Sequence, residues 1–151
     1  MRIVLISPPR ENVINTNLPS KLDQARGYAP PLGLLYIASY MKQHSPHTVA
    51  VIDCGVEEMS YPALKQKILE FKPDLVGIQV LSFTLIDSLK TAAMIKEISL
   101  STLIAFGGPH ITAYPKESLR NKNVDYVVMN EGEISFTSLA NNVRNFLELA
   151  N

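Results

Sequence analysis

Five short apolar runs, each separated from the next by helical patterns, constrain this chain more than any other feature of its sequence. The predicted strands are Ile3–Ile6, Val49–Ile52, Leu75–Val80, Leu103–Phe106 and Tyr126–Met129. The runs are continuously apolar and bounded by Pro, Gly, Asp or Asn, which is typical of strands buried on both faces of a parallel sheet. The alternation of strand and helix therefore predicts a parallel sheet joined by right-handed crossovers.

Apolar residues at helical spacing follow the strands. The predicted apolar faces are Leu34, Leu35, Ile37, Ala38 and Met41; Leu64, Ile68 and Phe71; Leu85, Leu89, Ala92, Ala93 and Ile95; and Ile134, Leu139, Val143, Phe146 and Leu147. A further short helix is predicted over Lys116–Arg120. We expect a three-layer α/β, flavodoxin-like fold with strand order 2-1-3-4-5 and a switch point between the first and third strands.

Composition limits the possible partners and compartments. The 151 residues predict one domain, and 14 basic against 14 acidic residues predict neither a nucleic-acid nor an anionic membrane partner. The apolar runs are too short to span a membrane, and the N-terminus is too short and too β-branched for a signal peptide, so we expect a cytoplasmic protein. The single cysteine, Cys54, excludes an internal disulfide, and with only three histidines it excludes a cysteine-rich metal site.

Four of the predicted strands end in turns of small or rigid residues. These turns are Ser7-Pro8-Pro9, Gln79-Val80-Leu81-Ser82, Gly107-Gly108-Pro109-His110 and Asn130-Glu131-Gly132-Glu133. In a parallel sheet they meet at the carboxyl edge, where ligands bind. The G-x-G-x-x-G and P-loop motifs are absent, as are the acidic residues of a receiver domain and a hydroxyl-rich flavin loop. We therefore expect the residues at this edge to bind a large ligand and not to catalyse bond cleavage.

Several of these turn residues also have a plain structural interpretation. Gly107-Gly108 could form an ordinary strand-to-helix turn, and His110 is more often a turn hydrogen-bonder than a metal ligand. Glu131 could serve a ligand or complement the positive end of the following helix. A small hydrolase using Ser82, His110 and Glu131 is disfavoured, because these residues lie on three separate turns without a nucleophile elbow. We expect no enzymatic activity from this domain alone.

The segment from Pro8 to Leu32 shows no clear periodicity and holds five of the ten prolines. Segments of this length in compact domains are usually functional or disordered. Its ends, Pro8-Pro9 and Tyr28-Ala29-Pro30-Pro31-Leu32-Gly33, are stiff, and Gly33 opens directly into a helix. We therefore favour an ordered loop that shapes the switch point over a floppy insertion.

The order and spacing of these motifs resemble a known family. The shared set is Ser7-Pro8-Pro9, the run Tyr28 to Ala38, Val76-Gly77-Ile78, Gly107-Gly108-Pro109-His110, and Asp125 to Val128 with Glu131-Gly132-Glu133. It is similar to the N-terminal cobalamin-binding domain of B12-dependent radical SAM enzymes, which include methyltransferases and anaerobic magnesium-protoporphyrin monomethyl ester cyclases. Asn130 stands where that family often has Gly, and the D-x-H-x-x-G motif of the wider B12 fold is absent.

The resemblance implies a site for cobalamin at the carboxyl edge. Pro8, Pro9, Pro30, Leu32 and Gly33 would face the corrin. The turn Gln79, Val80, Leu81 and Ser82 would line a pocket for the nucleotide tail, with Gly107, Gly108 and Pro109 against the tail or the ring amides and His110 beside them. Glu131 and Gly132 would complete the rim.

The resemblance also bears on the cobalt and on the rest of the polypeptide. The stretch from Ser7 to Gly33 contains no histidine, His44 and His47 lie beyond the following helix, and His110 follows the fourth strand. With the benzimidazole drawn into the tail pocket, we expect base-off, His-off binding. Residues 1–151 would be a fragment of a longer protein whose radical SAM barrel supplies the iron–sulfur cluster and S-adenosylmethionine. The alternative is a ligand-free, flavodoxin-like protein-interaction module.

Overall fold

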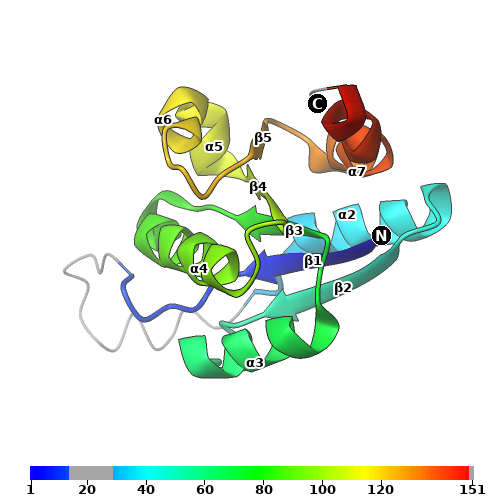
Figure 1. Ribbon diagram of the computed structural model, residues 1–151. Coiled ribbons are helices and arrows are strands. Elements are labelled where there is room, and N and C mark those ends of the chain that lie inside the picture. Colours follow the sequence, from blue (N-terminus) through cyan, green and yellow to red (C-terminus); the bar gives the residue numbers. More distant parts are fainter. Residues whose placement is uncertain (14–28, 150–151) are drawn as a thin grey trace.

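A five-stranded parallel sheet forms the centre of the molecule (Figure 1). The computed structural model describes residues 1–13 and 29–149, with side chains as far as Val143. The strands are β1 (Arg2–Ser7), β2 (Thr48–Asp53), β3 (Leu75–Gln79), β4 (Leu103–Gly107) and β5 (Tyr126–Val128). Their spatial order is β2-β1-β3-β4-β5, and all four pairings are parallel. The predicted strands, their order and the flavodoxin-like fold are confirmed.

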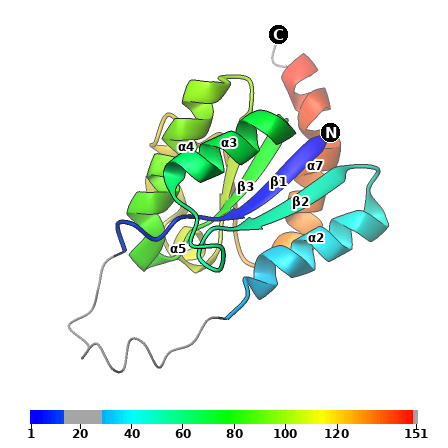
Figure 2. The same ribbon diagram turned by 90° about the horizontal axis from the view of Figure 1, so that it is seen from below.

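Helices cover both faces of this sheet (Figures 1 and 2). One layer holds α2 (Leu32–His44) and α7 (Gly132–Leu149), whereas α3 (Tyr61–Phe71) and α4 (Leu85–Ile98) form the other. The described residues also form three short elements, η1 (Ser82–Thr84), α5 (Pro109–Ala113) and α6 (Pro115–Leu119). None of the helices in the described part of the chain combines the length and apolar character that a membrane-spanning helix needs.

Strand side chains alternate between two separate hydrophobic cores, as the pleat of a sheet requires. Val4, Ile6, Val76 and Phe106 face α3 and α4. Ile3, Leu5, Leu75 and Ala105 face α2 and α7, where they pack with Leu34, Met41, Phe136 and Ala140. The register places Leu5 beside Gly77 and Gly77 beside Ala105, so these three residues form one row across the sheet.

Some details differ from the sequence-based expectations. Leu35 and Ile134, both assigned to apolar faces, are 42% and 71% exposed, because they lie in the first turns of α2 and α7, where the sheet ends. The segment from Pro109, expected as a turn, forms the short helix α5, since proline suits the first helical position. β2 is partly exposed, because it lies at the edge of the sheet and pairs with a strand on one side only.

The segment that joins β1 to α2 is described only in part. Residues 14–28 of the predicted loop lie outside the described residues. Pro8 and Pro9 are buried directly after β1, and α2 begins at Leu32, one residue before the predicted Gly33. The expectation that this loop is ordered and shapes the switch point stays a prediction.

Candidate functional site

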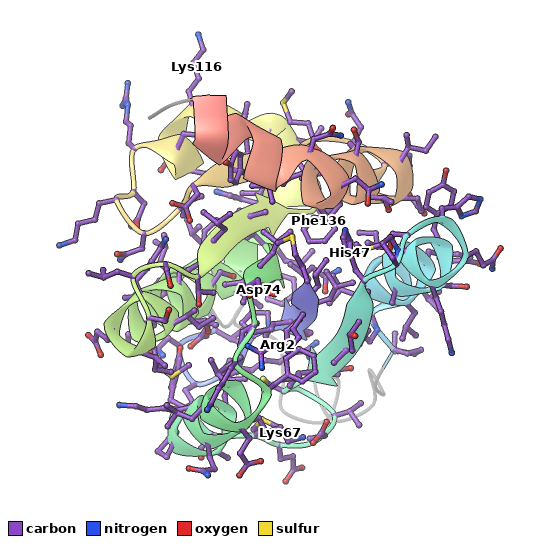
Figure 3. The ribbon with its side chains drawn as sticks, turned by 45° about the vertical axis from the view of Figure 1, so that its right-hand side comes forward. Arg2, His47, Lys67, Asp74, Lys116 and Phe136 are labelled. Carbon is purple, nitrogen blue, oxygen red and sulfur yellow. The ribbon has the colours of Figure 1, made fainter. Side chains whose placement is uncertain are left out.

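A cleft of about 550 Å³ opens at the carboxyl edge of the sheet, between the sheet and helices α2 and α7. Its interior, as we use the term below, includes Leu5, Ile37, Gly77, Ala105 and Phe136, whereas Val128 pairs with Gly107 and lies at the level of the rim. Figure 3 shows Phe136 between α7 and the sheet. The rim is formed by Gly33, Gln79, Gly107, Gly108, Pro109, Thr112, Asn130, Glu131, Gly132 and Glu133.

Small residues in neighbouring strands let other side chains pack closely at the base of the cleft. Gly77 and Ala105 are paired in the register of β3 and β4, on the face that α2 and α7 cover. A Cβ atom on Gly77 would lie 2.7 Å from Leu5 Cδ2 and 2.9 Å from Phe136 Cε2. The side chains of Leu5 and Phe136 therefore occupy the space above Gly77, and a larger residue at this position would collide with them.

The turn after β4 is held tightly against the end of β3. The Val80 backbone N–H donates to the Gly107 carbonyl at 2.7 Å, and the His110 backbone N–H donates to the Val80 carbonyl at 3.3 Å. Gly108 has φ +109°, and a Cβ atom there would lie 2.9 Å from the Val80 oxygen. The second glycine of this turn is thus required by backbone conformation and by close approach.

The start of α7 closes the opposite side of the cleft. A Cβ atom on Gly132 would lie 2.6 Å from Ile37 Cδ1, so glycine allows α7 to approach α2 closely. Asn130 adopts a left-handed conformation with φ +58°, and its backbone N–H donates to Thr112 Oγ1 at 3.0 Å. Glu133 lies in the first turn of α7, where its charge complements the helix dipole.

The structure brings about half of the sequence-predicted site residues to this cleft. Those that line it are Gly33, Gln79, Gly107, Gly108, Pro109, Glu131 and Gly132. The predicted residues outside the lining are Pro8, Pro9, Pro30, Leu32, Val80, Leu81, Ser82 and His110. Val80 is fully buried in the core beneath α4, whereas Leu32 is exposed beside the cleft at the start of α2.

His110 makes a turn contact. It is buried, and its Nδ1 atom lies 3.1 Å from Ser82 Oγ. Its ring packs against Tyr114 with 5.2 Å between centroids, and its Nε2 atom is buried without a hydrogen-bond partner. Glu131 is exposed on the cleft rim, which neither Ser82 nor His110 lines. The contact with Ser82 agrees with the interpretation of His110 as a turn hydrogen-bonder.

Sequence reasoning missed the interior of the cleft. Its residues other than Gly77 follow ordinary core patterns and carry no local signal. Gly77 is different, because a glycine between the β-branched residues Val76 and Ile78 of a buried strand indicates close approach of another group. That signal could have marked Gly77 as a position of close approach, although it does not identify Phe136 as the residue that approaches it.

Comparison with known proteins places this geometry in a family. The family model for the B12 binding domain matches residues 22–140. The chain belongs to the B12-binding domain family. A relative described as an uncharacterised methyltransferase of Pyrococcus horikoshii is 33% identical over 140 residues, which cover 92% of this chain and 28% of the relative. The anaerobic magnesium-protoporphyrin IX monomethyl ester cyclase of Rubrivivax gelatinosus is 28% identical over 134 residues, covering 88% of this chain and 23% of the cyclase.

A solved structure has the same fold. The cobalamin-dependent S-adenosylmethionine radical enzyme OxsB, with aqua-cobalamin bound, matches with a TM-score of 0.72 and 17% identity. The match covers 95% of this chain and 19% of OxsB. The chain therefore spans only about a quarter of the length of the curated relatives it matches.

Proposed function

We propose that this domain binds cobalamin at the carboxyl edge of its sheet, with the nucleotide tail in the cleft and the corrin over the rim. The observation that carries the proposal is a deep cleft at the switch point of a chain that belongs to the B12-binding domain family. Open α/β sheets bind ligands at this place. A volume of about 550 Å³ lies within the range of small-molecule sites, which are concave and mostly apolar.

The residues of the cleft suit such a ligand. Gly33 lies on the rim, and no atom lies within 4 Å of the position that its Cβ would occupy, so a side chain there would enter the open mouth. Gly107, Gly108 and Pro109 present backbone without long side chains beside the opening. We assign Gly33, Glu131 and Gly132 to the corrin side of the rim, and Gln79 with Gly107 to Pro109 to the tail. Pro30, Leu32, Leu81 and Ser82, none of which is buried, would complete the site, whereas Pro8, Pro9 and Val80 are buried and are left out of it. When bound, cobalamin can carry a methyl group or an electron.

A titration tests the proposal. Purified domain is mixed with hydroxocobalamin and followed by visible absorbance and gel filtration. We expect pigment to co-elute with protein at tens of micromolar. Gly33→Phe should fill the mouth and weaken binding at least about tenfold without loss of stability, because nothing contacts that position. Lys65→Phe adds the same ring to an exposed position on α3 and should bind normally. Clean separation of pigment from wild-type protein would refute the proposal and favour the protein-interaction module.

We further propose that binding is base-off and His-off. His44 ends α2 and His47 precedes β2, at the amino edge of the sheet, and His110 does not line the cleft. These positions support a cobalt without a histidine ligand. Electron paramagnetic resonance of the Co(II) form should lack nitrogen superhyperfine splitting. Splitting that is present in wild type and lost in His110→Ala would assign a ligand role to that residue and contradict the proposal.

The relatives suggest the larger context. We propose that the domain is the N-terminal module of a longer radical SAM methyltransferase or cyclase, in which an iron–sulfur cluster and S-adenosylmethionine belong to the barrel that follows. The names and lengths of the relatives support this assignment. The coding sequence downstream of Asn151 tests it: we expect a C-x-x-x-C-x-x-C motif, and a stop codon or an unrelated domain would refute it.

A further inference from the structure

The rim of the cleft carries negative charge on its α7 side. Glu131 is exposed and Glu133 is half-buried, both line the cleft, and neither carboxylate has an ion pair or a hydrogen bond within the described residues. No Lys, Arg or His side chain of that part of the chain lines the cleft. Helices α2 and α7 begin at this edge, and each amino end carries about half a positive charge. The two helix ends together offset one carboxylate, so the rim keeps about one negative charge.

Asn130, directly before Glu131, has a backbone conformation that asparagine usually adopts for a local reason. Its φ is +58°, in the left-handed region. Asparagine is tolerated there largely because its side chain can hydrogen-bond to nearby backbone. Here the bond to Thr112 comes from the backbone N–H of Asn130, and the side-chain amide makes none within the described residues. The amide therefore lies at the rim of the cleft with its donors and its acceptor free.

These groups suit one chemical feature of the proposed ligand. The corrin ring is surrounded by neutral carboxamides, each of which has two N–H donors and a carbonyl acceptor. A carboxamide can donate a charge-assisted hydrogen bond to Glu131 or Glu133, and it can both donate to and accept from the Asn130 amide. A carboxylate of the same shape has no N–H donor and brings a negative charge to a rim that is already negative.

We infer that Asn130, Glu131 and Glu133 bind peripheral carboxamides of the corrin and discriminate against corrinoids in which a carboxamide is replaced by a carboxylate. The inference rests on the proposed cobalamin site and concerns the rim of the cleft, not its interior. The specificity comes from repulsion as well as attraction. Two like charges about 4 Å apart repel each other, even at the dielectric constant of water, by an energy that weakens binding about fivefold.

Cobalamin and its monocarboxylic acids, in which one propionamide of the ring is a propionate, test the inference on the 151-residue chain. These ligands share the cobalt and the nucleotide tail, so they differ only in one peripheral group. Dissociation constants are measured by visible absorbance at low and at high salt. At low salt we expect at least one monoacid to bind at least about fivefold more weakly than cobalamin. The difference should shrink at high salt, because salt screens the repulsion.

A matched pair of glutamates separates the rim from the net charge of the domain. Glu131→Gln keeps the shape of the side chain and removes its charge, so it should narrow the difference between cobalamin and that monoacid by about two- to fivefold. Glu117→Gln removes the same charge from an exposed residue of α6 that does not line the cleft. It should leave the difference unchanged.

A second pair isolates the side chain of Asn130. Asn130→Gly removes the amide but keeps the backbone bond to Thr112, and glycine adopts the left-handed conformation freely, so stability in urea should change little. Cobalamin affinity should nevertheless fall about two- to tenfold, which corresponds to one neutral hydrogen bond. Lys72→Gly makes the same backbone change at φ +51°, directly after α3, and should leave the affinity unchanged.

The outcomes distinguish the inference from the proposed function. Equal affinities for cobalamin and all its monoacids, or equal effects of Glu131→Gln and Glu117→Gln on the difference, would overturn the inference and leave cobalamin binding intact. Wild-type affinity in Asn130→Gly would overturn it as well, because Asn130 would then only shape the turn. Failure of cobalamin itself to bind would overturn the proposed function.

Discussion

Removing one hydroxyl group, in Tyr61→Phe, should destabilise the domain measurably. Asp87 is completely buried on α4, and the Tyr61 hydroxyl donates to its Oδ1 atom at 2.6 Å. Asn12 donates twice to the same carboxylate, from its side-chain amide at 2.7 Å and its backbone N–H at 2.9 Å. Lys90 in turn donates to Asn12 Oδ1 at 2.8 Å. These contacts fasten the chain that leaves β1 to both α3 and α4.

The size of the effect follows from the partner of the hydroxyl. A hydrogen bond to a charged group contributes about 1.5–3 kcal/mol to stability, and Tyr61→Phe removes one such bond while the ring stays. The carboxylate keeps its two bonds from Asn12, so we expect a loss of about 1.5–3 kcal/mol in the free energy of unfolding. Tyr36→Phe deletes the same atom from an exposed residue of α2 and should change stability by less than about 0.5 kcal/mol.

Urea unfolding followed by circular dichroism measures both variants, and pH adds an independent test. Burial, the hydrogen bond to Asp87 and the charges of Asp87 and Glu11 raise the pKa of Tyr61 above its ordinary value near 10. A raised pKa in the folded state means that this contribution is complete below about pH 10 and is lost as pH rises towards the folded-state pKa. Wild type should therefore lose more stability above pH 10 than Tyr61→Phe. This account of the cluster would be refuted if Tyr61→Phe lowered the free energy of unfolding by less than about 0.5 kcal/mol and if the stability of both proteins changed in the same way above pH 10.

Three further perturbations test other contacts. Burial and the charge of Asp53 raise the pKa of the Cys54 thiol to about 12, so a thiol reagent at pH 8 should modify the native protein orders of magnitude more slowly than the unfolded chain; rapid native labelling would contradict this. Gly108→Ala should cost about 1–3 kcal/mol in urea unfolding, because φ is +109° and the new Cβ meets the Val80 oxygen, and a loss below 0.5 kcal/mol would be unexpected. Lys96→Met removes the contact of Lys96 Nζ with the Asp125 carboxylate at 2.8 Å and its hydrogen bond to the Thr102 carbonyl at 2.9 Å, while Asp125 keeps the Ile104 backbone N–H, so the loss should be at least about 1 kcal/mol. Lys116→Met, at the exposed lysine that points to solvent in Figure 3, is its neutral control.

Much of the fold could be predicted because each strand carries its own signal. The apolar runs of β1, β3 and β4 are continuous, since both of their faces are covered, and their bounds differ from the predicted ones by only one residue at an end. The strand order follows from general rules of crossover connections. The helix α5 was missed because Pro109 supports either a turn or a helical first position, and only packing decides between them.

The candidate site was less predictable, because its walls come from residues that are distant in sequence. The turns that form the rim could be predicted, because glycine and proline follow the apolar runs in the sequence. The interior depends on Gly77 and Ala105 being neighbours in register and on Phe136 reaching them from α7, and no local pattern specifies either relation. Val80, by contrast, was assigned to the site but is buried, because it comes directly after β3 with its side chain in the core beneath α4.

The places where the helical pattern fails coincide with the mouth of the cleft. Leu35 and Ile134 have the spacing of core residues, yet they are exposed, and Leu32 and Tyr36 beside them on α2 are exposed as well. Their helices begin at the carboxyl edge, so the first turns of α2 and α7 have little sheet to cover. The same geometry that leaves these side chains uncovered leaves the cleft open between Gly33 and Gly132, the rim glycines of those two turns. Conflict between local pattern and burial is expected at functional sites. Here it marks the edge at which a ligand would bind.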